Sequence, residues 1–208
     1  MRIAAPHPQA IPHRRVLLER IETLDYIAYE YELQEVASRL KSHGYRGAIC
    51  GPAGCGKSAM LHALGDELMA HGLTPLPLCV ERGREHALPS DWRRTIRKAR
   101  HTDALLLDGY GLLPAWARLW VWFASRRAGA VVVTARHEVR YQTLAKPKPT
   151  KHLLKQLAQR VLPASSAEVD YAALFEQCSG NLREALRLVS EASASQHPSA
   201  ESSQKQAG

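Results

Sequence analysis

The residues whose types and spacing are best suited to chemistry lie in one short run, Gly51–Ser58, which follows the pattern G-x-x-x-x-G-K-S. Glycines in such a run let the backbone curl until successive N–H groups point at one anion, and the start of the following helix adds partial positive charge. A lysine at this place reaches the β- and γ-phosphates, and the serine hydroxyl binds Mg²⁺. We therefore expect Mg·ATP to bind here, with contacts from Gly51, Pro52, Ala53, Gly54, Cys55, Gly56, Lys57, Ser58 and Ala59.

A second candidate is the aspartate that ends an apolar run. Asp108 closes the segment DALLLD at 103–108, where proteins with this loop place a carboxylate that holds Mg²⁺. The simpler alternative is a strand-end aspartate that caps the next turn. Gly109 follows, whereas many ATPases of this type carry a glutamate there that polarises the attacking water. We expect slow hydrolysis, or ATP used as a binding switch, with Glu81 as one substitute base to consider.

Strands and helices alternate around these residues. Short apolar runs predict strands at 47–50, 75–80, 103–108, 130–134 and 159–162. Helical periodicity and breakers predict helices at 30–40, 57–70, 91–100, 114–127, 166–177 and 181–192. This alternation is typical of a parallel sheet covered by helices on both faces. The expected fold class is α/β: a P-loop domain with a five-stranded, mostly parallel sheet and a small helical lid.

Prolines and polar residues refine this outline. Pro75 and Pro77 argue that the strand at 75–80 is an edge strand or that it starts there, and Ser90 is expected to cap the helix at 91–100. The basic stretch 136–157 is expected to begin as a loop and become helical near His152. The chain then divides into a partly irregular leader, the nucleotide-binding domain, the lid and a disordered tail at 1–27, 28–163, 164–193 and 194–208.

Together these pieces resemble the AAA+ ATPases, especially the origin-recognition initiator-like and transposition-helper branches. The resemblance covers about residues 28–193, and its motifs are the helix at 29–40, the Walker A loop at 51–58, the Walker B strand at 104–108, the turn at 161–163 and the lid motif GNLREA at 180–185. It implies that Thr134 is the polar sensor 1 residue and that Arg183 is the sensor 2 arginine that contacts the γ-phosphate. The residues alone leave another interpretation open, in which Asn181 and Glu184 form a capping box and Arg183 faces water.

The sequence also departs from the family pattern. The Walker B glutamate is missing, the lid is expected to have two helices, and no DNA-binding domain of the helix-turn-helix or winged-helix type follows it. No arginine is an unambiguous trans-acting finger, although Arg126, Arg127 and Arg136 are candidates. The resemblance implies a homo-oligomer, and the residues add little support to that expectation.

Charge points to a polyanionic partner. The formal net charge is +8 and the pI about 9.5, which favours double-stranded DNA or a DNA-bound protein. One basic patch is expected on the helix at 91–100 and another at Lys146, Lys148, Lys151 and Lys155. Arginine-rich helices often simply expose their charged face to solvent, so the patches alone do not decide whether DNA is a partner.

A tryptophan-rich helix is expected at 114–127. Helical spacing places Trp116, Leu119, Trp120 and Phe123 on one side, which we interpret as core, and leaves Trp122 as a candidate exposed contact.

Cysteine usage and hydropathy bound the compartment. Cys50, Cys55, Cys79 and Cys178 show no metal-ligand spacing, which indicates reduced thiols without disulfides or zinc. No run approaches the length of a membrane span, and no signal peptide is visible, so a cytoplasmic protein without a membrane partner is expected.

The leading hypothesis is an AAA+-like ATP-binding protein, either a slow ATPase or an ATP-gated switch, that acts on DNA or on a DNA-bound protein. The first alternative is a small-molecule or nucleoside kinase, which shares the phosphate loop but does not explain the motif at 180–185. The second is a degenerate, non-hydrolysing ATP-binding module that serves protein interaction.

Overall fold

The computed structural model describes residues 30–80, 87–161 and 169–196. The chain divides into two compact units between Lys148 and Pro149. We call the described residues before that point the sheet unit and those after it the helical unit. Among the described residues, every helix is too short or too polar to span a lipid bilayer.

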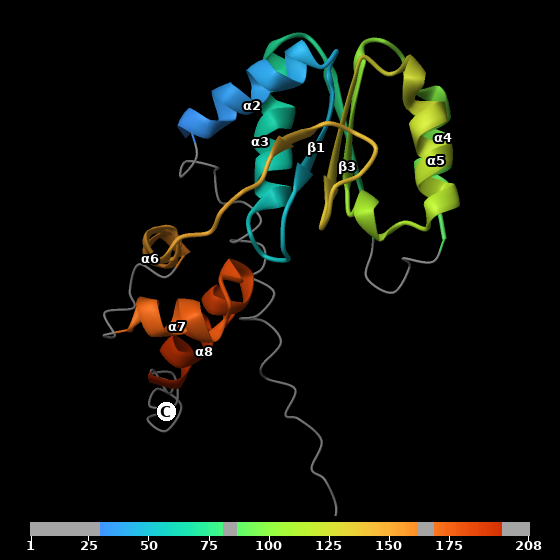
Figure 1. Ribbon diagram of the computed structural model, residues 1–208. Helices are drawn as coiled ribbons and strands as arrows, with labels where there is room; N and C mark the ends of the chain where they lie inside the picture. Colours follow the sequence, from blue (N-terminus) through green and yellow to red (C-terminus); the bar gives the residue numbers. More distant parts are fainter. Residues whose placement is uncertain (1–29, 81–86, 162–168, 197–208) are drawn as a thin grey trace, which may run out of the picture. The chain divides into compact units, whose positions relative to one another are not determined.

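The sheet unit is built on five parallel strands, in the order β2-β3-β4-β1-β5 (Figure 1). The strands are β1 (Arg46–Cys50), β2 (Thr74–Cys79), β3 (Asp103–Asp108), β4 (Ala130–Ala135) and β5 (Thr143–Ala145). The α/β class with a five-stranded parallel sheet is therefore confirmed.

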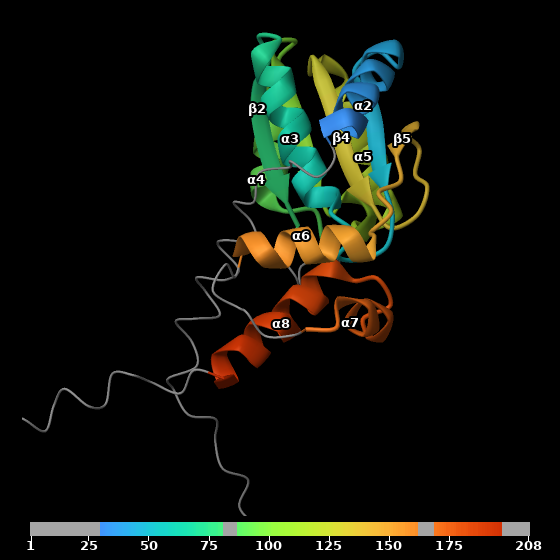
Figure 2. The ribbon, with the colours of Figure 1, turned by 90° about the vertical axis from the view of Figure 1, so that its left-hand side faces the viewer.

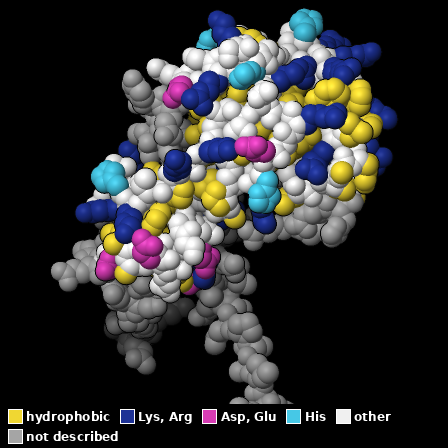
Figure 3. All heavy atoms as spheres, in the orientation of Figure 1, with side chains coloured by type: hydrophobic (Ala, Val, Ile, Leu, Met, Phe, Trp, Pro, Cys, Tyr) yellow, Lys and Arg dark blue, Asp and Glu magenta, His cyan; other side chains and the backbone are white. Residues whose placement is uncertain are grey.

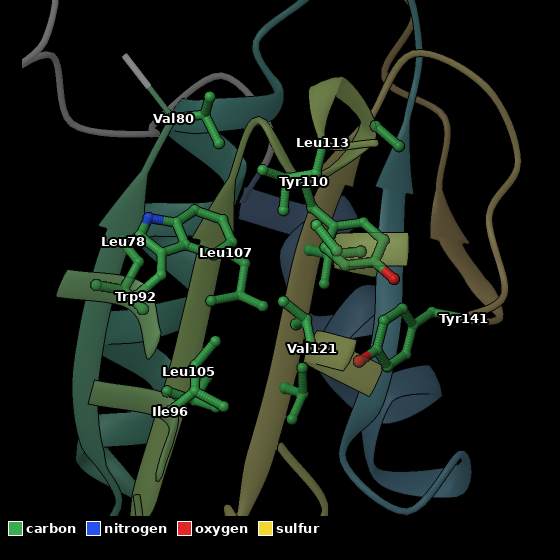
Figure 4. Packing of buried hydrophobic residues seen from close by; sticks show 14 of the residues in the cluster. Leu78, Val80, Trp92, Ile96, Leu105, Leu107, Tyr110, Leu113, Val121 and Tyr141 are labelled. Atoms are coloured by element: carbon green, nitrogen blue, oxygen red, sulfur yellow. The ribbon is translucent and has the colours of Figure 1, made fainter. Parts of the chain in front are cut away.

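Helices cover both faces of this sheet (Figures 1 and 2). One face carries α2 (Glu30–Ser42) and α3 (Lys57–Ala70), and the other carries α4 (Ser90–Lys98) and α5 (Ala115–Ala124). Successive residues of a strand point to opposite faces, so Leu106 packs with the α2–α3 side while Leu105 and Leu107 pack with the α4–α5 side. Figure 4 shows the second of these cores, where Trp92 and Ile96 of α4 meet the sheet. The unbroken apolar runs of β3 and β4 follow from this two-sided burial.

The two prolines of β2 are compatible with its position at the edge of the sheet. The N–H groups of Thr74 and Val80 donate to Thr102 and Asp108, so even-numbered residues face β3. Pro75 and Pro77 have the other parity, and their missing N–H groups fall on the open side, where no strand partner is needed. The predicted edge strand is confirmed.

A glycine lets α3 lie close to the sheet. A Cβ atom added at Gly65 would be 2.5 Å from Cδ1 of Leu106, so a larger residue would require the Leu106 side chain or the helix to move. Since α3 begins directly after the phosphate loop, this close packing fixes where the loop ends.

The predicted fifth strand at 159–162 is wrong. Residues Lys151–Val161 form helix α6, and the fifth strand is β5, only three residues long. Leu153, Leu154 and Ala158 are buried on one side of α6, a helical spacing that runs up to the segment predicted as a strand. The expected turn at 161–163 therefore does not follow a strand, and its residues 162 and 163 lie outside the described residues.

The helical unit consequently has three helices where two were expected. After α6 come α7 (Tyr171–Gln177) and α8 (Leu182–Gln196), and α6 packs against both of them (Figure 2). The unit begins at Pro149, upstream of the expected boundary after residue 163, because 151–161 belong to its first helix. The Lys151 ammonium pairs with the Glu176 carboxylate at 3.0 Å.

Two finer predictions about helix ends need correction. Ser90 is the first residue of α4 and not its cap, because the cap position is Pro89, whose side chain has no acceptor. The tryptophan-rich helix α5 ends at Ala124 and continues as a single 3₁₀ turn, η4 (Ser125–Arg127). The guanidinium of Arg46 donates to the carbonyls of Ser125, Arg126 and Ala128, which ties down the end of η4.

The predicted core face of α5 is wrong as well. Trp116, Leu119 and Phe123 are exposed, while Ala117 and Val121 are buried against the sheet. Trp120 and Trp122 are both partly buried at the margins of that core. Large apolar residues lie on several sides of α5, so their spacing does not single out the buried face, and the smaller residues fit closest to the sheet.

Candidate functional site

The phosphate loop connects β1 to α3 and has the backbone that its glycines were expected to provide. Gly54 and Gly56 adopt φ of +73° and +93°, which residues with a Cβ rarely reach. The N–H of Gly51 donates to Ala135 at 3.1 Å, which ties the start of the loop to the end of β4. The loop is therefore held between two neighbouring strand ends and the first turn of a helix.

Cys55 packs the underside of this loop. Its side chain is 0% exposed, and a Cβ added at Gly51 would be 3.0 Å from its Sγ. The variable position of Cys55 in the motif favours a structural or neutral role over a chemical one, and its burial under the loop supports the structural role.

Lys57 lies across the loop. Its ammonium donates to the carbonyl of Gly51 at 2.8 Å and to that of Pro52. The side chain is thus folded back over the loop, onto the carbonyls of its first two residues. These two carbonyl oxygens accept the hydrogen bonds from Lys57 that phosphate oxygens could accept instead.

The first turn of α3 has donors available for such an anion. Gly56 is the cap residue of α3, and no side chain caps its N-terminus among the described residues. Free N–H groups and the helix dipole there favour negative charge.

Three polar side chains meet at the carboxyl ends of β3 and β4. Ser58 donates from Oγ to Oδ2 of Asp108 at 2.8 Å, and Thr134 donates from Oγ1 to Oδ1 of the same carboxylate at 2.5 Å. The N–H of Gly109 in turn donates to Thr134 at 2.8 Å. The structure thus brings the candidate magnesium residues and the candidate sensor 1 residue into one hydrogen-bonded cluster.

Gly109 is fixed as a glycine by its surroundings. Its φ is +76°, and a Cβ added there would be 3.1 Å from Cβ of Val80. The chain then enters the 3₁₀ turn η3 (Tyr110–Leu112). The place of the expected glutamate therefore has a backbone on which a side chain would be strained. Glu81, the candidate substitute base, lies outside the described residues.

Arg183 stands on the first turn of α8, in the helical unit, with an exposed side chain. The N–H of Glu184 donates to Oδ1 of Asn181 at 3.3 Å, which is one half of the expected capping box. The other half is not formed, because the Glu184 carboxylate binds the Arg187 guanidinium. This pairing lowers the pKa of Glu184 and raises that of Arg187.

The remaining basic candidates differ in whether their charged groups already contact other side chains. Lys146 pairs with Glu138 at 2.8 Å and Lys151 with Glu176, so half of the second basic patch is already neutralised. Arg126 is stacked over the rings of Trp122 and Phe123. Arg127 and Arg136 are exposed.

Comparison with known proteins identifies the fold. No family model matches the chain, and no curated protein matches it. Among solved structures it is similar to a mutant form of RuvB from Thermotoga maritima, with a TM-score of 0.54 and 18% sequence identity. The match covers 79% of this chain and 60% of that chain, so this chain spans less than two thirds of its neighbour.

The chain shares the P-loop α/β fold of this RuvB structure. At this identity the likeness concerns the fold alone.

Proposed function

We propose that this protein binds Mg·ATP in the loop Gly51–Ser58 and acts as a slow ATPase or an ATP-gated switch. The observation that carries the proposal is the cluster of Ser58, Asp108 and Thr134 beside the lysine of the loop. A curled loop, a helix start without a side-chain cap and a hydroxyl–carboxylate pair are what a Mg-bound triphosphate requires. The AAA+-like fold supports the same function.

The side chains of the loop and of the cluster fit both a triphosphate and Mg²⁺. The Lys57 ammonium would exchange its bonds to Gly51 and Pro52 for phosphate oxygens. Ser58 and Asp108 would hold Mg²⁺, whose chemistry is to neutralise charge on the phosphates. Among the described residues, no group of three or more His, Cys, Asp or Glu side chains is placed to hold a metal ion. The cation would therefore draw its other ligands from phosphate and water, as Mg²⁺ commonly does.

Slow hydrolysis follows from the backbone at Gly109. A general base contributes about 10²–10⁴-fold to a rate, and the position that would supply it has a positive φ and no side chain. A chain of this kind retains ATP long enough for the bound state itself to be the signal. Within the family resemblance, Thr134 and Arg183 would report that state, and a helical lid would respond to it.

The proposed partner is double-stranded DNA or a protein bound to it. The formal net charge of +8 supports a polyanion. Binding that neutralises phosphates releases counterions, so affinity would fall steeply as salt is raised. The finer resemblance, to the initiator-like and transposition-helper branches, also favours this partner.

Calorimetry tests nucleotide binding. ATP with Mg²⁺ is titrated into the wild type, into Lys57→Ala and into Lys41→Ala, a matched change of an exposed lysine on α2. We expect binding to the wild type and to Lys41→Ala, and at least a tenfold loss for Lys57→Ala with unchanged circular dichroism. Absence of heat for a folded wild type would overturn the proposal.

Hydrolysis is measured separately, in single-turnover experiments with and without double-stranded DNA over a range of salt. We expect slow turnover that DNA stimulates at low salt only. Transfer of phosphate to a nucleoside or metabolite would instead favour the kinase alternative.

A further inference from the structure

Helices α4 and α5 present a surface that nucleotide binding does not use. It consists of the exposed apolar side chains of Trp116, Leu119 and Phe123, together with three arginines that stack on neighbouring rings, Arg97, Arg126 and Arg140. We call this set the α4–α5 surface. Figure 3 shows hydrophobic side chains gathered there with Lys and Arg around them.

The apolar part is a stripe along α5. Trp116, Leu119 and Phe123 are 59%, 45% and 52% exposed and are spaced i, i+3 and i+7, so they lie on one face of the helix. At 1.5 Å per residue the stripe extends over about 10 Å, or two helical turns. Single exposed apolar residues need no explanation, but a continuous apolar patch on a surface helix is typical of an interaction site.

The arginines are positioned by the rings beside them. The guanidinium carbon of Arg97 lies 5.7 Å from the ring centroid of Trp120, while those of Arg126 and Arg140 lie 4.6 and 4.9 Å from that of Trp122. A guanidinium stacked on a ring keeps its N–H edge free for a carboxylate. Holding the arginines in place beforehand lowers the entropy cost of binding.

The charge on this surface is predominantly positive. The elements α4, α5 and η4 contain one carboxylate, Asp91, and seven arginines and lysines: four on α4, one on α5 and two on η4. Among the described residues no carboxylate pairs with Arg97, Arg126 or Arg140. On α4, Arg93 and Arg97 are like charges at i and i+4, which destabilises a helix by a few tenths of a kcal/mol. Carboxylates from outside would relieve this repulsion.

These features favour one kind of binding partner for the α4–α5 surface over others. Single-stranded nucleic acid would need a series of free ring faces for successive bases to stack on, but arginines already stack on Trp120, Trp122 and Phe123, which leaves Trp116 as a single ring without a stacked arginine among the described residues. A second copy of this chain would bring the same arginines into the interface, and like charges facing each other are unfavourable. A helix with apolar residues on one side and carboxylates beside them matches both the stripe and the arginines.

We propose that the α4–α5 surface docks an acidic amphipathic helix of a partner protein. Its apolar side chains cover Trp116, Leu119 and Phe123, and its carboxylates bind Arg97, Arg126 and Arg140. Tryptophan and arginine are the residue types that most often dominate binding energy at protein interfaces. Docking at this surface does not depend on nucleotide.

A random peptide library displayed on phage tests the proposal. The full-length protein is the target, without nucleotide, and a Trp116→Ala, Phe123→Ala double variant is the counter-target. We expect enriched peptides to carry apolar residues at helical spacing together with Asp or Glu. Enrichment of basic or uncharged peptides, or no enrichment over the counter-target, would overturn the proposal.

The best enriched peptide is then labelled and titrated by fluorescence anisotropy. Its affinity should fall at least tenfold for Trp116→Ala and for Arg126→Gln, and it should weaken as salt is raised. Met69→Ala is the matched control, because Met69 is 58% exposed on α3, on the other face of the sheet. Equal affinity for all variants would contradict the proposal.

Three further experiments separate this docking from nucleotide binding, from nucleic acid and from a second copy of the chain. Lys57→Ala should bind the peptide as the wild type does, so a failure of nucleotide binding leaves this result intact. A single-stranded oligonucleotide that binds through Trp116 and displaces the peptide would overturn the proposal in favour of nucleic acid. A dimer, seen by light scattering, that Phe123→Arg dissociates would overturn the proposal in favour of a second copy of the chain.

Discussion

Thr134 binds Asp108 and Gly109 at once: its hydroxyl donates to the Asp108 carboxylate at 2.5 Å and accepts the Gly109 N–H at 2.8 Å. The hydroxyl therefore joins the ends of two adjacent strands, β3 and β4. It also fixes which oxygen of Asp108 remains for Ser58. A change at Thr134 should therefore alter both the stability of the fold and the affinity for the ligand.

Thr134→Val keeps the shape of the side chain and removes the hydroxyl. The Gly109 N–H would lose its acceptor in a site that is 2% exposed at Thr134, which should cost about 1–3 kcal/mol of unfolding free energy. Urea denaturation measures this loss, and ATP affinity with Mg²⁺ should fall as well. Thr134→Ser, which keeps the hydroxyl, should be close to the wild type. Equal stability of the valine and serine variants would contradict this role.

Ser58→Ala removes the hydroxyl that faces Asp108. Because a serine at this place binds Mg²⁺ more than it binds phosphate, the variant should still bind ATP but lose most of the gain in affinity that Mg²⁺ provides. Titrations with Mg²⁺ and with EDTA give this difference directly. Ser42→Ala on α2 is the control, since its hydroxyl donates to the Arg39 carbonyl within the same helix. A magnesium effect of wild-type size in Ser58→Ala would rule out the assignment.

Arg183→Ala tests the proposed sensor 2 arginine. Its side chain is exposed, whereas Arg187 on the same helix is engaged by Glu184 and Glu191. We expect Arg183→Ala to weaken binding of ATP and leave that of ADP unchanged, because the family contact is to the γ-phosphate. Arg187→Ala should leave both affinities unchanged. Should both nucleotides bind Arg183→Ala as they bind the wild type, Arg183 is only a solvated residue.

High pH should unfold the sheet unit. Burial raises the pKa of Tyr110 and of Tyr141, whose rings meet edge to face in the α4–α5 core, 5.6 Å apart (Figure 4). Unfolded tyrosines ionise near pH 10, so above that pH the unfolded state loses protons that the native state keeps. Stability then falls with rising pH, by about 1.4 kcal/mol per pH unit for each such tyrosine.

Tyr141→Phe should make this fall less steep, and urea denaturation at a series of pH values above 9 gives the slope. At neutral pH the variant loses a long contact to Ser125, 3.4 Å between the hydroxyl oxygens, so its stability there should change little. An identical slope in wild type and variant would show that Tyr141 ionises freely in the folded protein.

Much of the sheet could be predicted because its strands are buried on both faces. The runs LLL in β3 and VVV in β4 admit few other structures, and the glycines of the phosphate loop mark where α3 begins. The helix α3 and the strand β3 have the predicted bounds for that reason. The convergence of Ser58, Asp108 and Thr134 also follows from strand ends meeting at one edge of a parallel sheet.

Other parts depend on contacts that a sequence does not display. Strand β5 is three residues long inside a basic stretch, and it is held by Leu144 packing where Gly47 has no side chain. Helix α6 ends in a segment whose valine and leucine also suit a strand. Helix α5 has large apolar residues on several sides, so its buried face was decided by fit to the sheet. The bond between Thr134 and Gly109 likewise exists only once two strands are paired.

The conformation of Gly109 limits how this type of site can be altered. With φ at +76° and Val80 directly beside it, the residue cannot be exchanged for glutamate without bending the chain at the end of β3. That bend would move the aspartate next to it, which the hydroxyls of Ser58 and Thr134 hold. Introducing a glutamate by one substitution would therefore disturb the proposed cation site, and placing an acid there would require rebuilding the whole connection from β3 to η3.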